Sequence, residues 1–167
     1  MIEIKPPRRI QGHENSLPAI FLGGSIEMGA AENWQEKLSD AMKDLDVVIC
    51  NPRRDNWDSS WEQRASNPMF SQQVNWELDH LENADIIVFY FDPETKSPIT
   101  LMELGLMAGL YEHKDYGCGG RPRILVCCPD GFWRKGNVEI VCSRANIPLF
   151  NTFGGLVDVL KATIRTQ

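Results

Sequence analysis

The fold is organised around two adjoining segments, Ile86-Ile-Val-Phe-Tyr-Phe91 and Ser97-Pro-Ile-Thr-Leu-Met-Glu-Leu-Gly-Leu-Met-Ala-Gly109. The first segment is a continuous apolar run with the length and composition of a buried strand. The second opens with a serine followed by a proline, which is typical of a helix with a capping hydroxyl and proline at its first position. We therefore expect a buried strand, a short loop and a buried helix.

Glu103 is the one carboxylate between Ser97 and Leu110. Burying an ionised carboxyl costs several kcal/mol unless the group is paired or used. Thr100-Leu-Met-Glu103 matches a capping box, in which the glutamate bonds a backbone N–H at the helix start. Alternatively, the positive end of the helix dipole keeps the carboxylate ionised, which suits a nucleophile. The residues alone leave both interpretations open.

Strand-like runs alternate along the chain with amphipathic segments. Strands are expected at 19–24, 47–50, 85–91, 123–128 and 147–150. Helices are expected at 33–45, 68–83, 99–110 and 156–164, and the polar segment 132–143 is expected to be partly helical. This alternation predicts an α/β fold: a doubly wound, five-stranded parallel sheet of flavodoxin-like or Rossmann-like type with helices on both faces. Residues 1–18 are interpreted as an N-terminal arm or short edge strand, and residues 19–167 as a single domain.

Composition limits the classes of function. The 167 residues fit one domain, and the net charge of -6 argues against binding to nucleic-acid polymers or anionic membranes. No apolar run approaches the roughly 20 residues that span a bilayer, and the charged N-terminus does not resemble a signal peptide. We therefore expect a cytoplasmic protein. Five cysteines without a C-x-x-C pair and three scattered histidines predict buried free thiols and no metal site.

In a parallel sheet the carboxyl ends of the strands meet at one edge, where ligands bind. That edge would collect Gly23-Gly-Ser25, Asn51-Pro-Arg-Arg-Asp55 and the segment 92–97. The glycine-rich turn 23–29 either presents backbone N–H groups to an anion or sugar hydroxyl, or is simply a tight turn. Its spacing fits neither the dinucleotide nor the P-loop pattern. Arg53-Arg54 is either a clamp for phosphate or carboxylate, or a solvated pair.

Glu77 lies in the expected helix 68–83, at the border of its apolar face. One interpretation makes it an exposed helix residue. The other brings it to the same pocket as Glu103, and two converging carboxylates are what glycosidic-bond chemistry requires.

Three short motifs carry a family resemblance: Phe-Leu-Gly-Gly-Ser-Ile at 21–26, Asn-Ala-Asp-Ile at 83–86 and Met-Glu-Leu-Gly at 102–105. With them, most of residues 19–160 resembles the nucleoside 2-deoxyribosyltransferase family and the related nucleoside 5'-monophosphate N-glycosidases. The elements 51–55 and 136–138 are more similar to the divergent branch called nucleoside 2-deoxyribosyltransferase-like. The resemblance implies that Glu103 is the nucleophile and that Glu77 replaces the family's second acidic residue, usually aspartate.

The chain departs from the family pattern in three places. Phe21 stands where the transferases have a tyrosine that orients the glutamate, and Ser97 where they have an aspartate that holds the base. The family's C-terminal carboxylate ends an aromatic tail, whereas this chain ends in Arg165-Thr-Gln167. Fold and bond type are therefore better supported by the resemblance than the substrate is.

The implied activity is attack on the N-glycosidic bond of a (2'-deoxy)nucleoside by a retaining mechanism without a cofactor. Glu103 would form a glycosyl-enzyme, and Glu77 would bind sugar hydroxyls or help protonate the base. The implied binding residues are Gly23, Gly24, Ser25, Asn51, Arg53, Asp55, Ser97 and Asn137. Glu27 and Asp55 beside the anion-binding groups favour an uncharged nucleoside over a 5'-monophosphate. Two alternatives remain: hydrolysis of a monophosphate or NAD-type N-glycoside, and a non-catalytic nucleotide-binding module.

The chain is predicted to form at least a dimer. Helix 99–110 and loop 56–67, with Trp57 and Trp61, carry more apolar surface than a small monomer usually exposes, and the family that the chain resembles is homo-oligomeric. Each interface should bury more than about 1,000 Å². Static light scattering at micromolar concentration measures the mass directly, and a monomeric value contradicts this prediction.

Overall fold

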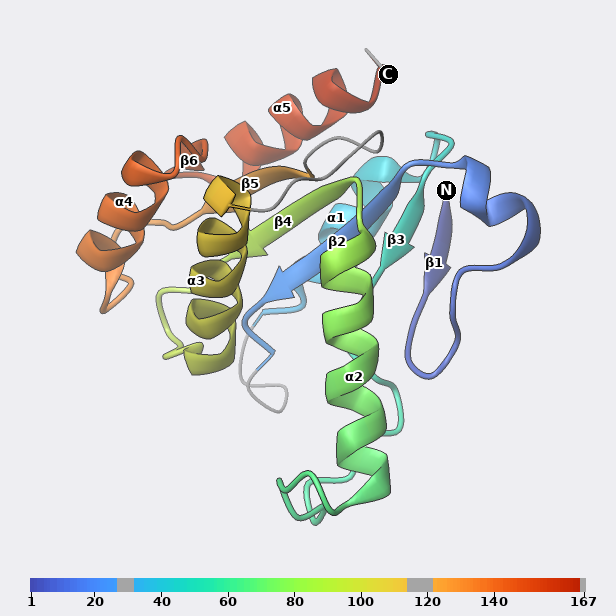
Figure 1. Ribbon diagram of the computed structural model, residues 1–167. Helices are drawn as coiled ribbons and strands as arrows, with labels where there is room; N and C mark the ends of the chain where they lie inside the picture. Colours follow the sequence, from blue (N-terminus) through green and yellow to red (C-terminus); the bar gives the residue numbers. More distant parts are fainter. Residues whose placement is uncertain (27–31, 114–121, 166–167) are drawn as a thin grey trace.

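The computed structural model describes residues 1–26, 32–113 and 122–165. Its sheet has six parallel strands in the order β1-β3-β2-β4-β5-β6 (Figure 1). The strands are β1 (Ile2–Ile4), β2 (Ala19–Gly24), β3 (Val48–Cys50), β4 (Ile86–Tyr90), β5 (Arg123–Cys127) and β6 (Leu149–Phe150). The predicted parallel, doubly wound sheet is confirmed, and without β1 its strand order is flavodoxin-like.

The predicted number of five strands is wrong by one, because Ile2–Ile4 pairs with Val48–Cys50 as an edge strand. Three residues are too few to show a strand periodicity. The rest of the first 18 residues also packs on the domain: Trp76 Nε1 donates to the Arg8 carbonyl at 2.6 Å, and Arg9 pairs with Asp79 at 2.6 Å.

Helices cover both faces of the sheet. They are α1 (Trp34–Met42), α2 (Pro68–Asn83), α3 (Pro98–His113), α4 (Lys135–Arg144) and α5 (Phe153–Arg165), with a short 3₁₀ helix at Gly12–Ser16. Helices α2, α3 and α4 lie on one face and α1 and α5 on the other (Figure 1). All five predicted helical segments are present, with ends that differ by a few residues.

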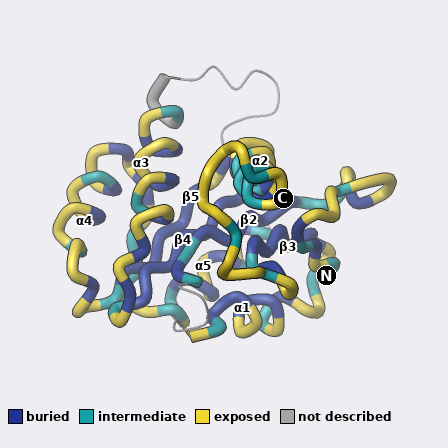
Figure 2. Tube along the Cα trace, turned by 90° about the horizontal axis from the view of Figure 1, so that it is seen from below, coloured by how far each residue is buried: buried dark blue, intermediate teal, exposed yellow. Residues whose placement is uncertain are grey.

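Two separate apolar clusters fill the spaces between the sheet and its helices. Successive residues of β4 point to opposite faces, so Ile87 and Phe89 belong to one cluster and Ile86 and Val88 to the other. The strands are accordingly buried on both sides, while exposed residues line the outer faces of the helices (Figure 2). This two-sided burial explains why the central strand reads as an uninterrupted apolar run.

The strand order creates a switch point between β2 and β4. The connection that leaves the carboxyl end of β2 leads to β3 on one side, and the connection that leaves β4 leads to β5 on the other side. The two connections therefore diverge. In open α/β sheets this divergence forms the crevice in which ligands bind.

No helix of the described segments is long and apolar enough to cross a bilayer.

Gly24 allows the close approach of three elements at this switch point. A Cβ at Gly24 would lie 2.5 Å from Cζ2 of Trp34 and 2.7 Å from the carbonyl oxygen of Tyr90. A Cβ at Gly23 would lie 2.6 Å from the ring of Phe89. Close packing, rather than the conformation of a tight turn, therefore requires glycine here.

Gly24→Ala is predicted to lower the free energy of unfolding by about 1–3 kcal/mol, because the tryptophan ring and a β4 carbonyl must both shift. Gly109→Ala is the control. It lies inside α3, and apart from the adjacent backbone of that helix no atom of the described residues lies within 4 Å of its added Cβ. The change should raise stability by about 0.5–1 kcal/mol. Urea unfolding measures both variants, and an equal effect of the two changes contradicts the packing argument.

Candidate functional site

Glu103 lies in the second turn of α3, which begins at Pro98. The carbonyl of Ser97 accepts the first helical bond, from the Leu101 N–H at 3.0 Å, so Ser97 stands at the N-cap position. Thr100 is inside the helix, and Glu103 is too far along it to bond the backbone at the helix start. The capping-box interpretation of Glu103 is therefore wrong, whereas the predicted helix start at Ser97-Pro98 is confirmed.

The side chain of Glu103 is buried close to a second carboxylate. The residue is 6% exposed, and none of the described residues forms a hydrogen bond with its side chain. Burial, followed by the nearby negative charge of Glu77, raises the pKa of Glu103 to about 8. The carboxyl is thus mostly protonated at neutral pH. Burial and the like charge of Glu77 both act against the ionised form that the helix dipole was expected to favour.

Glu77 reaches this site from α2, the neighbour of α3 on the same face of the sheet (Figure 1). It is half-buried, so its interpretation as an exposed helix residue is also wrong. Burial raises the pKa of Glu77 to about 6, while a hydrogen bond from Gln73 opposes the shift. Glu77 titrates first, next to a still neutral Glu103, and Glu103 then titrates next to a charge. Burial therefore favours the protonated form of both carboxyls, and the charge of Glu77 favours it further at Glu103.

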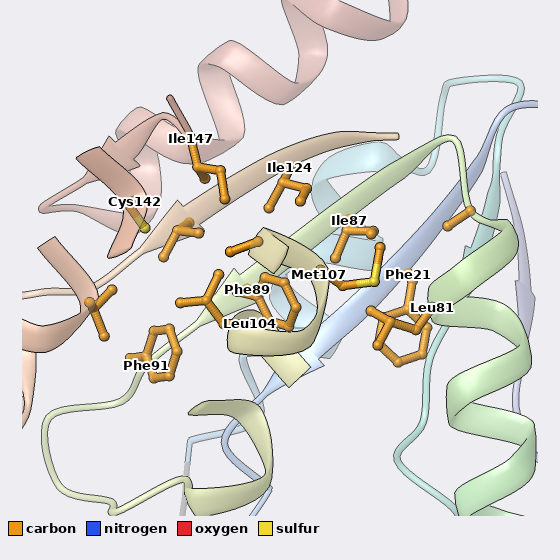
Figure 3. Packing of buried hydrophobic residues seen from close by; sticks show 14 of the residues in the cluster. Phe21, Leu81, Ile87, Phe89, Phe91, Leu104, Met107, Ile124, Cys142 and Ile147 are labelled. Carbon is orange, nitrogen blue, oxygen red and sulfur yellow. The ribbon is translucent and has the colours of Figure 1, made fainter. Parts of the chain in front are cut away.

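The packing beneath the pair is apolar. Figure 3 shows Leu104 and Met107 of α3 over Phe21 and Phe89 of the sheet, with Leu81 of α2 beside them. All five side chains are almost completely buried. Glu77 and Glu103 lie on the two helices that contribute to this apolar cluster, and burial is the main cause of the raised pKa of each.

Three hydroxyl groups form a buried cluster at the switch point. Thr95 Oγ1 lies 2.7 Å from Ser25 Oγ and 2.8 Å from Ser97 Oγ, and the two serines are also hydrogen-bonded. The Asp92 N–H donates to Ser25 Oγ at 3.1 Å. The cluster ties the end of β2 to the loop after β4 and holds Ser97 at a φ of 45° before α3. The sequence predicted Ser25 and Ser97 as ligand contacts and missed Thr95, which completes the set.

Asn51 and Asp55 hold the N-terminal segment in place. Asn51 is 3% exposed, and its Nδ2 donates to Glu3 at 2.9 Å while its Oδ1 accepts from the Arg53 N–H at 3.0 Å. Asp55 is exposed and pairs with Lys5 at 2.7 Å. Both predicted binding side chains are thus engaged within the chain in this structure.

Arg54, next to the predicted Arg53, is the more buried of the two arginines at 8% exposure. Its guanidinium donates to Asn56 at 2.9 Å and to Gln72 at 3.2 Å, and lies 5.2 Å from the Trp61 ring centroid. Nη1 of each arginine is buried with no hydrogen-bond partner among the described residues. The interpretation of a solvated arginine pair is therefore wrong.

Asn137 is exposed on α4, which lies on the opposite side of α3 from α2 (Figure 1). It lines a groove of about 330 Å³ between α3 and α4. The other lining residues are Leu101, Leu104, Gly105, Trp133, Arg134, Val138 and Val141. The structure therefore brings Glu103 together with Glu77 but leaves Asn137 on a separate, largely apolar surface.

The structure describes four of the five cysteines and the beginning of the glycine-rich turn. Cys50, Cys127, Cys128 and Cys142 are buried free thiols as predicted, whereas Cys118 lies outside the described residues. In the described part of the chain no three His, Cys, Asp or Glu side chains are grouped to hold a metal ion. The end of the glycine-rich turn, 27–31, also lies outside the described residues.

A comparison with family models matches residues 17–132 to the family described as nucleoside 2-deoxyribosyltransferase like. The matched part contains β2, β4, Glu77 and Glu103, and ends before Asn137. Among curated proteins none matches the chain.

Glu103→Gln is predicted to raise stability at alkaline pH. The unfolded carboxyl loses its proton near pH 4.5, but the folded one keeps it until about pH 8. Stability therefore falls as the pH rises through this window, by at most about 1.4 kcal/mol per unit of pKa shift. Thermal unfolding at pH 5 and pH 8.5 should show a clear gain for the variant only at the higher pH. An equal loss at both values would mean that Glu103 has a structural role.

Proposed function

The chain belongs to the nucleoside 2-deoxyribosyltransferase-like family, and from this premise we propose that it cleaves or transfers the N-glycosidic bond of a (2'-deoxy)nucleoside. The observation that carries the proposal is the buried carboxyl of Glu103, which forms no hydrogen bond with the described residues and lies beside Glu77. A group kept in this state lowers stability, which is typical of functional residues.

The proposed reaction proceeds in two steps with retention. The ionised Glu103 attacks the anomeric carbon through an oxocarbenium-like transition state, and the bond from that carbon to the base nitrogen breaks. The electron pair of the broken bond stays on the base, which takes up a proton. A second base or a water molecule then displaces Glu103 from the glycosyl-enzyme.

A shared proton in the carboxyl pair suits this sequence. Glu103 must lose a proton before it attacks, and the leaving base must gain one. If Glu77 accepts the proton from Glu103 and passes it to the base, no external acid is needed. The raised pKa values of Glu77 and Glu103, about 6 and about 8, favour a shared proton near neutral pH.

The position of Glu103 also bears on the alternative of a non-catalytic binding module. That alternative assigned Glu103 to the helix cap, and its place in the second turn of α3 removes this role. A cleavage reaction therefore accounts better for the buried carboxyl of Glu103 than binding alone does.

The test is a liquid-chromatography screen of deoxynucleosides, ribonucleosides, their 5'-monophosphates and NAD, each with and without a free acceptor base. We expect release or exchange of the base from a deoxynucleoside. Exchange identifies a transferase, and release alone identifies a hydrolase. No product from any member of the panel contradicts the proposed function.

Glu103→Gln should lower turnover in this screen by several orders of magnitude, because the amide keeps the shape of the side chain but cannot act as the nucleophile. The control is Glu139→Gln, which changes an exposed glutamate of α4 and should keep wild-type turnover. A folded Glu103→Gln protein with near-normal turnover contradicts the role of Glu103.

A further inference from the structure

Gln73 connects Glu77 to the edge of the sheet. It lies in α2, four residues before Glu77, and is 4% exposed. Its Nε2 donates to Glu77 Oε1 at 2.8 Å and to the carbonyl oxygen of Pro52 at 2.9 Å. Because both partners only accept, the two protons of the amide nitrogen are used and the orientation of the side chain is determined.

The Pro52 carbonyl is a firm anchor for this contact. It follows Asn51, whose N–H donates to the Ile4 carbonyl of β1 at 2.9 Å and whose side chain bonds Glu3. The position of Glu77 Oε1 is therefore set by the edge of the sheet as well as by its own helix. Its second oxygen, Oε2, takes no part in this contact.

The other end of the Gln73 amide is unsatisfied. Its Oε1 is buried and accepts no hydrogen bond from the described residues. Such an orphan acceptor costs about 1–3 kcal/mol, and an apolar side chain of similar size would avoid that loss. The two hydrogen bonds that the Gln73 amide donates must therefore offset this cost.

A neutral donor suits a carboxyl that must both take up and release a proton. A cation at this position would hold Glu77 ionised, whereas an amide opposes the effect of burial only in part. Charged groups on the elements around α2 include Glu103 on α3, Arg53 and Arg54 after β3, and Arg9, which pairs with Asp79 of α2. Among the described residues, no cation contributes to the pKa shift of either glutamate.

We propose that Gln73 is a positioning residue that holds Glu77 as the proton acceptor for Glu103. The inference rests on the proposed function for its catalytic consequence. The proton of Glu103 passes to Glu77, and the Glu103 carboxylate attacks the anomeric carbon. The bond to the base breaks with its electron pair on the base nitrogen, and the proton moves from Glu77 to the base. Nucleophile, base and orienting group then form the arrangement typical of activated nucleophiles.

The orientation is tested without substrate by NMR titration of side-chain carboxyls in protein labelled with ¹³C-glutamate. Glu77→Gln and Glu103→Gln assign the two signals. Gln73→Met removes the donor and should raise the titration midpoint of Glu77 measurably above its wild-type value. Asn75→Met is the matched control, because Asn75 is an exposed amide on the same helix, and within the described segments its side chain bonds Ser71 alone. It should leave both midpoints unchanged.

A Glu77 midpoint that is the same in Gln73→Met and Asn75→Met overturns the inference. If Gln73→Met does not fold, the Glu77 midpoint is measured in Gln73→Asn instead. This variant keeps the amide, but its side chain is one methylene too short to reach both Glu77 and the Pro52 carbonyl. It should shift the midpoint in the same direction.

The pH dependence of kcat/KM then separates the proposed function from the proposed role of Gln73. In wild type, kcat/KM should follow a bell with limbs near pH 6 and pH 8, the pKa values of the free pair. Gln73→Met should move the acid limb upward and lower kcat by about tenfold or more with little change in KM. A wild-type protein without activity contradicts the proposed function, and the NMR titration still decides the role of Gln73.

Discussion

The pairing of β2 with β4 is the constraint on which the rest of the structure depends. Their parallel register runs from Ile20 opposite Ile86 to Gly24 opposite Tyr90, and it brings the two strands to the same edge of the sheet. Gly24 has no side chain there, so Trp34 can pack against the strand end. The buried hydroxyls of Ser25, Thr95 and Ser97 then join the two connections. In this way strand pairing determines where α3 begins, and hence where Glu103 lies.

The site is built at the expense of local stability. Two carboxyls share an apolar surrounding in which one stays protonated at neutral pH, and Gln73 leaves a buried acceptor unsatisfied. The arginines after β3 likewise bury nitrogen atoms that have no hydrogen-bond partner in the described part of the chain. The scaffold beneath these groups is a continuous apolar cluster from α2, α3, α4 and the sheet. Such a core can hold unfavourable groups in fixed positions, as catalytic geometry requires.

Local signals in the sequence determined most of the fold. The runs 19–24 and 86–91 are apolar at every position or carry glycine, which predicts strands buried on both faces. Ser97-Pro98 predicts a helix start, and α3 begins at that proline. Glu103 was identified as the exceptional residue because a carboxylate in an apolar helix is visible without any structure. The edge strand β1 was too short to give a comparable signal.

The tertiary structure alone decided how the site residues are used. Asn51 bonds Glu3 across 48 positions, Ser25 bonds Thr95 across 70, and Gln73 reaches back to Pro52 across 21. Periodicity and capping patterns report on neighbours within a few residues, so they carry no information about these partners. The same is true of the protonation of Glu103, which burial and the Glu77 charge control. The sequence by itself determined which elements form and which carboxylate is exceptional. Only the tertiary structure decided the hydrogen-bond partners and the pKa values, because both depend on groups that are distant in the sequence and that folding brings within a few ångströms of each other.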